Sequence, residues 1–144
     1  MTISTGDTSL LYQQLILEHY RRPRNRGALP DATHQSAASN PVCGDEVVVQ
    51  VRMREKVIEA VMFSGRGCAI SQAAASLMTD ALRGRTLEEG ARLKERFTAL
   101  LQGNADAGRD EELGSLRGLA GIARFPVRIR CALLPWEALE AATR

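Results

Sequence analysis

The chain has 144 residues and a mass of 15.7 kDa, the size of a single domain. Hydrophobic residues make up 44% and charged residues 25%, which excludes a disordered or collagen-like chain and indicates a soluble globular protein. The net charge of +2 and the absence of an apolar run of ~18–20 residues predict that neither nucleic acid nor a membrane is a partner.

Residues 1–8 are small and polar, which predicts a flexible tail. Apolar residues at helical spacing then predict a helix over residues 9–22, ended by Pro23. The basic stretch 21–27 is rich in turn-forming residues. It is read as a solvated loop, with a docking surface for an acidic partner as the alternative. A short edge strand over residues 33–37 is a weaker prediction.

Residues 46–54 alternate between apolar and polar side chains, the pattern of a half-buried strand. Residues 56–64 are predicted to be its hairpin partner, although their alternation does not show which face is buried. The short connection 64–67 leads directly to Cys68.

Four helices are predicted in the second half of the chain, over residues 70–82, 87–101, 111–122 and 126–143. A capping box of Thr86 and Glu89 opens the second of these, and Pro135 is expected to kink the last. Strands and helices are segregated along the chain. The predicted fold is therefore α+β, with a small antiparallel sheet of two to three strands packed against about five helices in one domain, residues 1–144.

Three cysteines without an apparent secretion signal argue against a disulfide framework and predict a cytoplasmic protein. Cys43 lies in a turn before the central strand, and Cys68 lies at a helix N-terminus, where the helix dipole favours a thiolate. Cys131 lies near the start of the last helix. Such thiols at element ends can converge on one point, whereas the alternative is that they are inert and buried.

Asp45 follows Cys43 by two residues, so both side chains can point to the same centre in an extended segment. Three sulfurs and one carboxylate make a four-ligand set suited to tetrahedral Zn²⁺ or to an iron–sulfur cluster. The alternative for Asp45 is an ordinary turn or cap residue. The paired Cys-x-x-Cys spacing of many metal sites is absent.

The chain also resembles the U-type iron–sulfur assembly proteins, which are IscU-like and SufU-like. The resemblance runs from Leu11 to Leu139 and rests on four segments in the same order. They are Leu11-Tyr-Gln-Gln-Leu-Ile-Leu-Glu-His-Tyr20, Asn40-Pro-Val-Cys-Gly-Asp45, Phe63-Ser-Gly-Arg-Gly-Cys-Ala-Ile-Ser-Gln-Ala73 and Arg128-Ile-Arg-Cys-Ala-Leu-Leu-Pro-Trp136.

Two features place the resemblance on the SufU-like branch. Arg130 stands where IscU-like scaffolds carry a histidine, and residues 86–118 look like the SufU-type insertion. The resemblance implies a Zn²⁺ site formed by Cys43, Asp45, Cys68 and Cys131. It also implies sulfur transfer from a SufS-type cysteine desulfurase and delivery to downstream Suf scaffold proteins.

Cys43 is the predicted persulfide acceptor, because its loop can move and because the resemblance points the same way. Asp45 is predicted to act as ligand or gate. Arg66 and Arg130 each lie within two residues of a predicted ligand, so we expect their positive charges to offset the negative charge of the metal site. Arg130 could instead belong to the surface that docks the partner protein.

Two alternatives remain open at this point. The same ligands could carry iron or a transient [2Fe–2S] cluster, which would make the chain a scaffold. A protein of another class, a non-catalytic interaction module stabilised by zinc, would need the metal only to fold.

Overall fold

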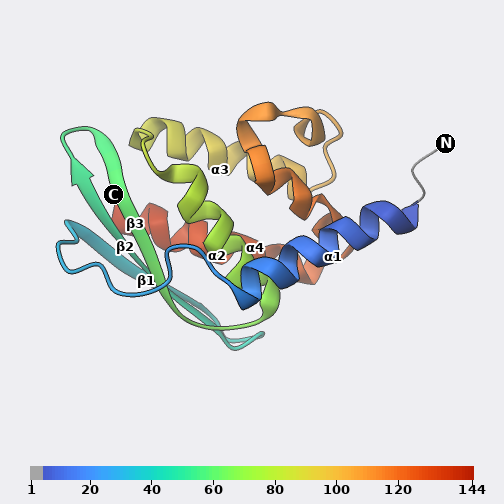
Figure 1. Ribbon diagram of the computed structural model, residues 1–144, viewed down its shortest axis with the longest axis horizontal. Coiled ribbons are helices and arrows are strands. Elements are labelled where there is room, and N and C mark those ends of the chain that lie inside the picture. Colours follow the sequence, from blue (N-terminus) through green and yellow to red (C-terminus); the bar gives the residue numbers. More distant parts are fainter. Residues whose placement is uncertain (1–4) are drawn as a thin grey trace.

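The computed structural model describes residues 5–144 of the chain, with side chains from Leu11 onward (Figure 1). The elements follow the order α1 (Thr5–Arg21), β1 (His34–Asn40), β2 (Asp45–Arg54), β3 (Val57–Arg66), α2 (Ala69–Leu82), α3 (Leu87–Leu101), the 3₁₀ segments η1 (Ala107–Arg109) and η2 (Glu111–Arg124), and α4 (Pro126–Ala142). The strands form one antiparallel sheet in the order β1-β2-β3, which confirms the predicted α+β fold. Within the described residues, no helix combines the length and apolar content that crossing a membrane requires.

The sheet is buried on the face that the alternation in β2 predicts. Val47, Val49 and Val51 are fully buried, and Val49 pairs with Phe63 of β3. The register shifts so that Arg52 pairs with Ala60 while Met53 pairs with Ile58. One extra residue in β3 therefore lets Ile58 and Val61 both face the core, which explains why the alternation in this strand was ambiguous.

The helices cover the buried face of the sheet. α4 packs on β1 and β2, and α2 lies between α4, α1 and η2 (Figure 1). Trp136 of α4 is fully buried and its ring lies 5.7 Å from that of Phe97 in α3. α2 is therefore the central helix, and it holds Cys68 at its N-terminus between layers that cannot easily move.

Three element boundaries differ from the sequence prediction. α1 begins at Thr5, so residues 5–8 are helical, whereas residues 1–4 of the predicted tail lie outside the described residues. β1 spans His34–Asn40 and so extends beyond residue 37, where the predicted strand ends. α4 is one helix from Pro126 to Ala142 with Pro135 inside it, so the helix does not restart at the proline.

The segment predicted as an insertion, residues 86–118, forms α3, η1 and part of η2. Two glycines of η2 have a packing role: a Cβ atom on Gly118 would meet the side chain of Leu15, and one on Gly121 would lie 3.0 Å from the ring of Tyr12. η2 therefore lies close against α1, and a larger residue at either position would require Leu15 or Tyr12 to shift.

Candidate metal centre

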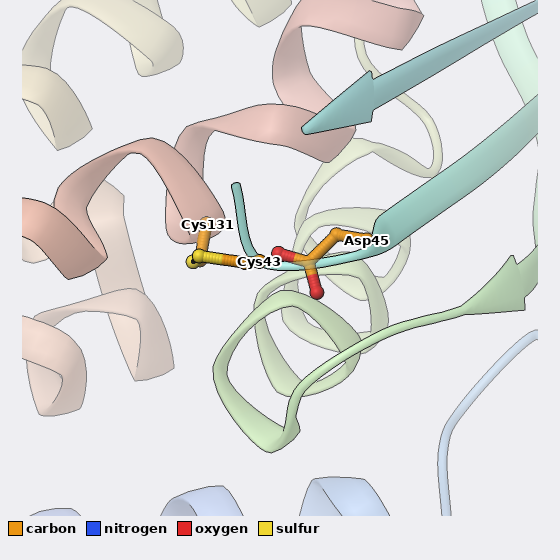
Figure 2. A group of neighbouring side chains, drawn as sticks. All are labelled: Cys43, Asp45 and Cys131. Carbon is orange, nitrogen blue, oxygen red and sulfur yellow. Dashed lines mark hydrogen bonds between the residues drawn. The ribbon is translucent and has the colours of Figure 1, made fainter. Parts of the chain in front are cut away.

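Three of the four predicted ligands meet at the end of the sheet where β2 begins (Figure 2). Cys43 lies in the turn between β1 and β2, Asp45 is the first residue of β2, and Cys131 lies in the second turn of α4. Each offers one ligand atom, and these atoms lie within 4.8 Å of one another. The Cys131 thiol donates a hydrogen bond to the Cys43 sulfur over 3.3 Å.

Cys68, the fourth predicted ligand, reaches this group through Asp45. The backbone N–H of Cys68 donates to Oδ1 of Asp45 over 2.8 Å, and the Cys68 sulfur lies 3.8 Å from Oδ2. Cys68 is the N-cap of α2, where its sulfur accepts a hydrogen bond from the N–H of Ser71. The carboxylate of Asp45 thus joins the helix start to the other two thiols.

The turn that carries Cys43 is shaped by its neighbours. Asn40 is buried, its side chain accepts a hydrogen bond from the N–H of Val42, and its carbonyl accepts one from the N–H of Cys43. Gly44 has a φ of +71°, which L side chains rarely adopt, and it sends the chain into β2. Cys43 and Asp45 consequently point to one centre, as their spacing predicts.

Burial separates the four side chains into two pairs. Cys131 and Asp45 are fully buried, whereas Cys43 and Cys68 are half-buried and open to solvent. Burial, and then the hydrogen bond with Cys43, raise the pKa of the Cys131 thiol well above its ordinary value. The Cys131 thiol is therefore harder to ionise than a free cysteine, and a bound cation would favour its thiolate form.

Arg128 is the basic side chain beside the sulfurs, and sequence reasoning did not identify it. A hydrogen bond to Cys131, and then the charges of Cys68 and Cys131, raise the pKa of its guanidinium. The signal was available, because Arg128 precedes Cys131 by three residues and the two share one face of α4. Arg130 and Arg128 are both exposed, and Arg66 forms an ion pair with Glu46 at 3.6 Å; the predicted charge-offsetting roles of Arg66 and Arg130 stay predictions.

The donor set fits a zinc ion. A tetrahedral zinc with bonds of about 2.3 Å to sulfur and about 2.0 Å to oxygen separates two sulfurs by about 3.8 Å and a sulfur from an oxygen by about 3.5 Å. The Cys43–Cys131 separation of 3.3 Å and the Cys68–Asp45 separation of 3.8 Å lie within half an ångström of these values. Cys43, Asp45 and Cys131 therefore lie close enough to surround one ion, and the Cys68 sulfur lies beside the carboxylate of Asp45.

Gly67 lies directly behind Asp45, and its replacement by alanine is expected to disrupt the centre. A Cβ atom there would lie 2.6 Å from Oδ1 of Asp45 and from the hydroxyl of Ser71. Because both atoms are held by hydrogen bonds to the backbone of Cys68, we expect the carboxylate to be displaced and zinc affinity to fall by about tenfold or more. Chelator competition would measure the loss.

The matched control is Gly108→Ala, because a Cβ atom on Gly108 meets nothing within 4 Å. Its zinc affinity should equal that of the wild type. Equal affinities for the Gly67 variant and the control would contradict the placement of Asp45 in the centre.

The two histidines do not join this group. His19 is buried, and its Nδ1 lies 2.7 Å from the hydroxyl of Ser76 on α2. Burial, and then the charge of Arg24, lower the pKa of His19, so the ring is neutral in the folded chain. Arg24 and Arg26, in the basic stretch after α1, bond within the chain, to Glu18 and to the carbonyl of Gly65.

Comparisons with known proteins identify a matching family and relatives of similar sequence. The family described as "NifU-like N terminal domain" matches residues 11–143. The chain is 38% identical over 130 residues to the "Zinc-dependent sulfurtransferase SufU" of Bacillus subtilis (strain 168), covering 90% of this chain and 87% of that protein. It is 40% identical over 134 residues to the "Iron-sulfur cluster assembly scaffold protein IscU" of Streptococcus pyogenes serotype M1, covering 93% and 83%.

Solved structures share the fold. The crystal structure of FiSufU from Fervidobacterium islandicum AW-1 has a TM-score of 0.84 and 29% sequence identity, covering 94% of this chain and 98% of that one. A NifU-like protein (N-terminal) from Brucella abortus has a TM-score of 0.80 at 24% identity, over 96% of this chain and 94% of that one.

Proposed function

This chain belongs to the NifU-like N-terminal domain family, and from that premise we propose that it is a zinc-dependent sulfur carrier in iron–sulfur cluster assembly. The observation that carries the proposal is the meeting of Cys43, Asp45 and Cys131 at one end of the sheet, with Cys68 hydrogen-bonded to the same carboxylate. Three thiols from distant parts of the chain gathered at a partly open site are suited to accept sulfur and to bind a soft metal.

In the proposed reaction, the thiolate of Cys43 attacks the outer sulfur of a persulfide on the donor protein. A new S–S bond forms to Cys43, the S–S bond of the donor breaks, and the donor cysteine leaves as a thiolate. No net oxidation or reduction occurs, since one persulfide is exchanged for another. A cysteine desulfurase of the SufS type is the proposed donor, and Suf scaffold proteins are the proposed recipients.

Each nearby residue has a role in this scheme. Zinc, held by Cys43, Asp45, Cys68 and Cys131, would keep the thiols deprotonated at neutral pH. Asp45 fixes the start of α2 through the Cys68 N–H and is the weakest of the four donors for a soft metal, which suits it to act as ligand or gate. Arg128 offsets the negative charge of the thiolates. Arg130 is exposed, and in this proposal it belongs to the face that docks the desulfurase.

Exposure and hydrogen bonding support Cys43 as the proposed acceptor. It lies on a turn beside Val42, which is 84% exposed, so a partner can reach it. Cys131 is fully buried, and Cys68 is held by hydrogen bonds with Asp45 and Ser71. Among the three thiols, that of Cys43 therefore has the freedom to approach another protein.

The same ligands support a second candidate function, the assembly of a transient [2Fe–2S] cluster. Iron–sulfur clusters also prefer thiolates, and several relatives carry the name of an IscU scaffold. Spectra after anaerobic reconstitution with iron and sulfide separate the two, because zinc is colourless and a [2Fe–2S] cluster absorbs visible light.

The proposed function is tested by desulfurase turnover. We expect the zinc-loaded protein to raise the rate at which a SufS-type desulfurase converts cysteine to alanine, because accepting sulfur frees the donor for the next cycle. Protein stripped of zinc is the control and should stimulate the rate less. A rate that does not respond to the zinc-loaded protein would contradict the sulfur-carrier role.

A further inference from the structure

A pocket of about 530 Å³ lies where η2 packs against the middle of α1. Its walls are largely apolar: Leu11, Tyr12 and Leu15 line it from α1, and Phe125 lines it where the chain leaves η2. Leu11 is 66% exposed and Phe125 is 51% exposed. Large apolar side chains that meet water around one pocket are typical of a binding surface.

The charged residues that line this pocket are both arginines. Arg117 and Arg124 are exposed, and no acidic residue is among the described residues of its walls. Arg128 lies close by. Burial raises the pKa of the Tyr12 phenol, and the charges of Arg128 and Arg124 oppose that rise as smaller effects. Apolar walls with positive charge beside them fit a partner that presents apolar side chains together with carboxylates.

The pocket lies next to the candidate metal centre. Arg128 connects the two, because its backbone N–H donates a hydrogen bond over 2.7 Å to the carbonyl of Phe125 and its side chain bonds to Cys131. The Cys131 sulfur in turn lies 3.3 Å from that of Cys43. A protein that delivers sulfur to Cys43 with an interface of ordinary size, about 800 Å² on each partner, would therefore extend over the pocket.

We propose that this pocket is a docking groove for an acidic amphipathic segment of the sulfur-donating desulfurase. The α1–η2 groove is the surface formed by Leu11, Tyr12, Leu15, Arg117, Arg124 and Phe125. This inference rests on the proposed function and adds to it the surface that holds the donor. Apolar side chains of the segment fill the groove, and its carboxylates pair with the two arginines.

The first test reverses a charge of the groove. Binding of the zinc-loaded chain to a purified SufS-type desulfurase is measured by titration calorimetry at low and at physiological salt. Arg124→Glu should bind about tenfold more weakly and lose less affinity when salt is added, because repulsion replaces attraction. The matched control is Arg92→Glu, which reverses an exposed charge on α3 outside the groove and should bind within about twofold of wild type.

The second test removes an apolar contact. Leu11→Ser should weaken binding by about fivefold, because an exposed side chain that the segment would cover is lost. The matched control is Leu17→Ser, which lies on the same helix, is 45% exposed and does not line the groove. Zinc affinity and unfolding temperature should match wild type in all four variants, which separates loss of docking from damage to the centre or the fold.

A cross-link identifies the chemistry of the occupant. Gln13 is exposed and lines the groove, so a photo-reactive benzoylphenylalanine in its place should attach to the bound desulfurase. Mass spectrometry should find the link on a peptide that carries both carboxylates and apolar side chains. A linked peptide without carboxylates would overturn the inference.

The remaining outcomes separate this inference from the proposed function. If wild type stimulates the desulfurase while Arg124→Glu and Leu11→Ser bind it as tightly as their controls do, the inference falls and the proposed function stands. A dimeric wild type that Leu11→Ser converts to a monomer would identify a second copy of the chain as the occupant and would also overturn the inference. A wild type that neither binds nor stimulates the desulfurase would contradict the proposed function and, with it, the groove.

Discussion

Replacing Cys43 by serine should abolish sulfur acceptance, with the transfer rate falling by more than about 100-fold. A serine hydroxyl occupies nearly the same volume, but it does not ionise near neutral pH and forms no persulfide. The measurement is the transfer of labelled sulfur from the persulfide form of a desulfurase, read by mass spectrometry of the intact chain. It should be made at saturating zinc, because serine is also a poorer ligand than cysteine.

Val42→Ala is the matched control for this variant. Val42 precedes Cys43 in the same turn and is 84% exposed, so its truncation removes side-chain atoms without touching the sulfurs. Its sulfur acceptance should stay within a few-fold of the wild type. If Cys43→Ser accepts sulfur as well as wild type, the acceptor must be another residue, and the half-buried Cys68 would be the next to test.

Loading the chain with zinc should raise its unfolding temperature by about 10 °C while the metal-free chain stays folded. A ligand present at a thousand times its dissociation constant contributes about 4 kcal/mol. For a domain of this size, about 1 kcal/mol corresponds to roughly 3 °C. Calorimetry of the zinc-loaded and chelator-treated protein would measure the difference, with far-ultraviolet circular dichroism reporting whether the metal-free chain is folded.

The folded state of the metal-free chain is expected because the core does not depend on the centre. Phe63, Met78, Phe97, Leu119 and Trp136 are fully buried members of the hydrophobic core cluster, which includes none of the four predicted ligand side chains. If removing zinc unfolded the chain, the metal would have a structural role, as in a zinc-stabilised interaction module. That result, together with a desulfurase rate that ignores the protein, would favour the module over the sulfur carrier.

Local patterns predicted most of the fold. The alternation in residues 46–54 identified the buried face of β2, because a strand with one buried face repeats every two residues. The capping box at Thr86 and Glu89 located the start of α3, and both of its hydrogen bonds are present. The same reasoning did not identify the buried face of β3, because one extra residue interrupts its two-residue alternation between Ile58 and Val61.

The centre was predictable in part, because its residues have chemistry visible in the sequence. Cys43, Asp45 and Cys131 meet as the motif spacing indicated, and Cys68 lies beside Asp45. Their assignment as zinc ligands stays a prediction.

The supporting residues could not be found in the same way. The role of Gly67 depends on a carboxylate 22 residues before it in the chain, and the α1–η2 groove depends on how two distant segments pack together. Such features follow from tertiary packing, which periodicity does not record.

Pro135 has a consequence for the chemistry of the last ligand. A proline has no N–H, so in the interior of α4 it leaves the carbonyl four residues earlier without its helical donor, and that carbonyl belongs to Cys131. The backbone that holds the most deeply buried sulfur is therefore tied less firmly than the rest of its helix. In the proposed transfer cycle, the missing hydrogen bond would let the Cys131 sulfur follow a change in ligand geometry, while Trp136 and Leu139 remain buried in the core.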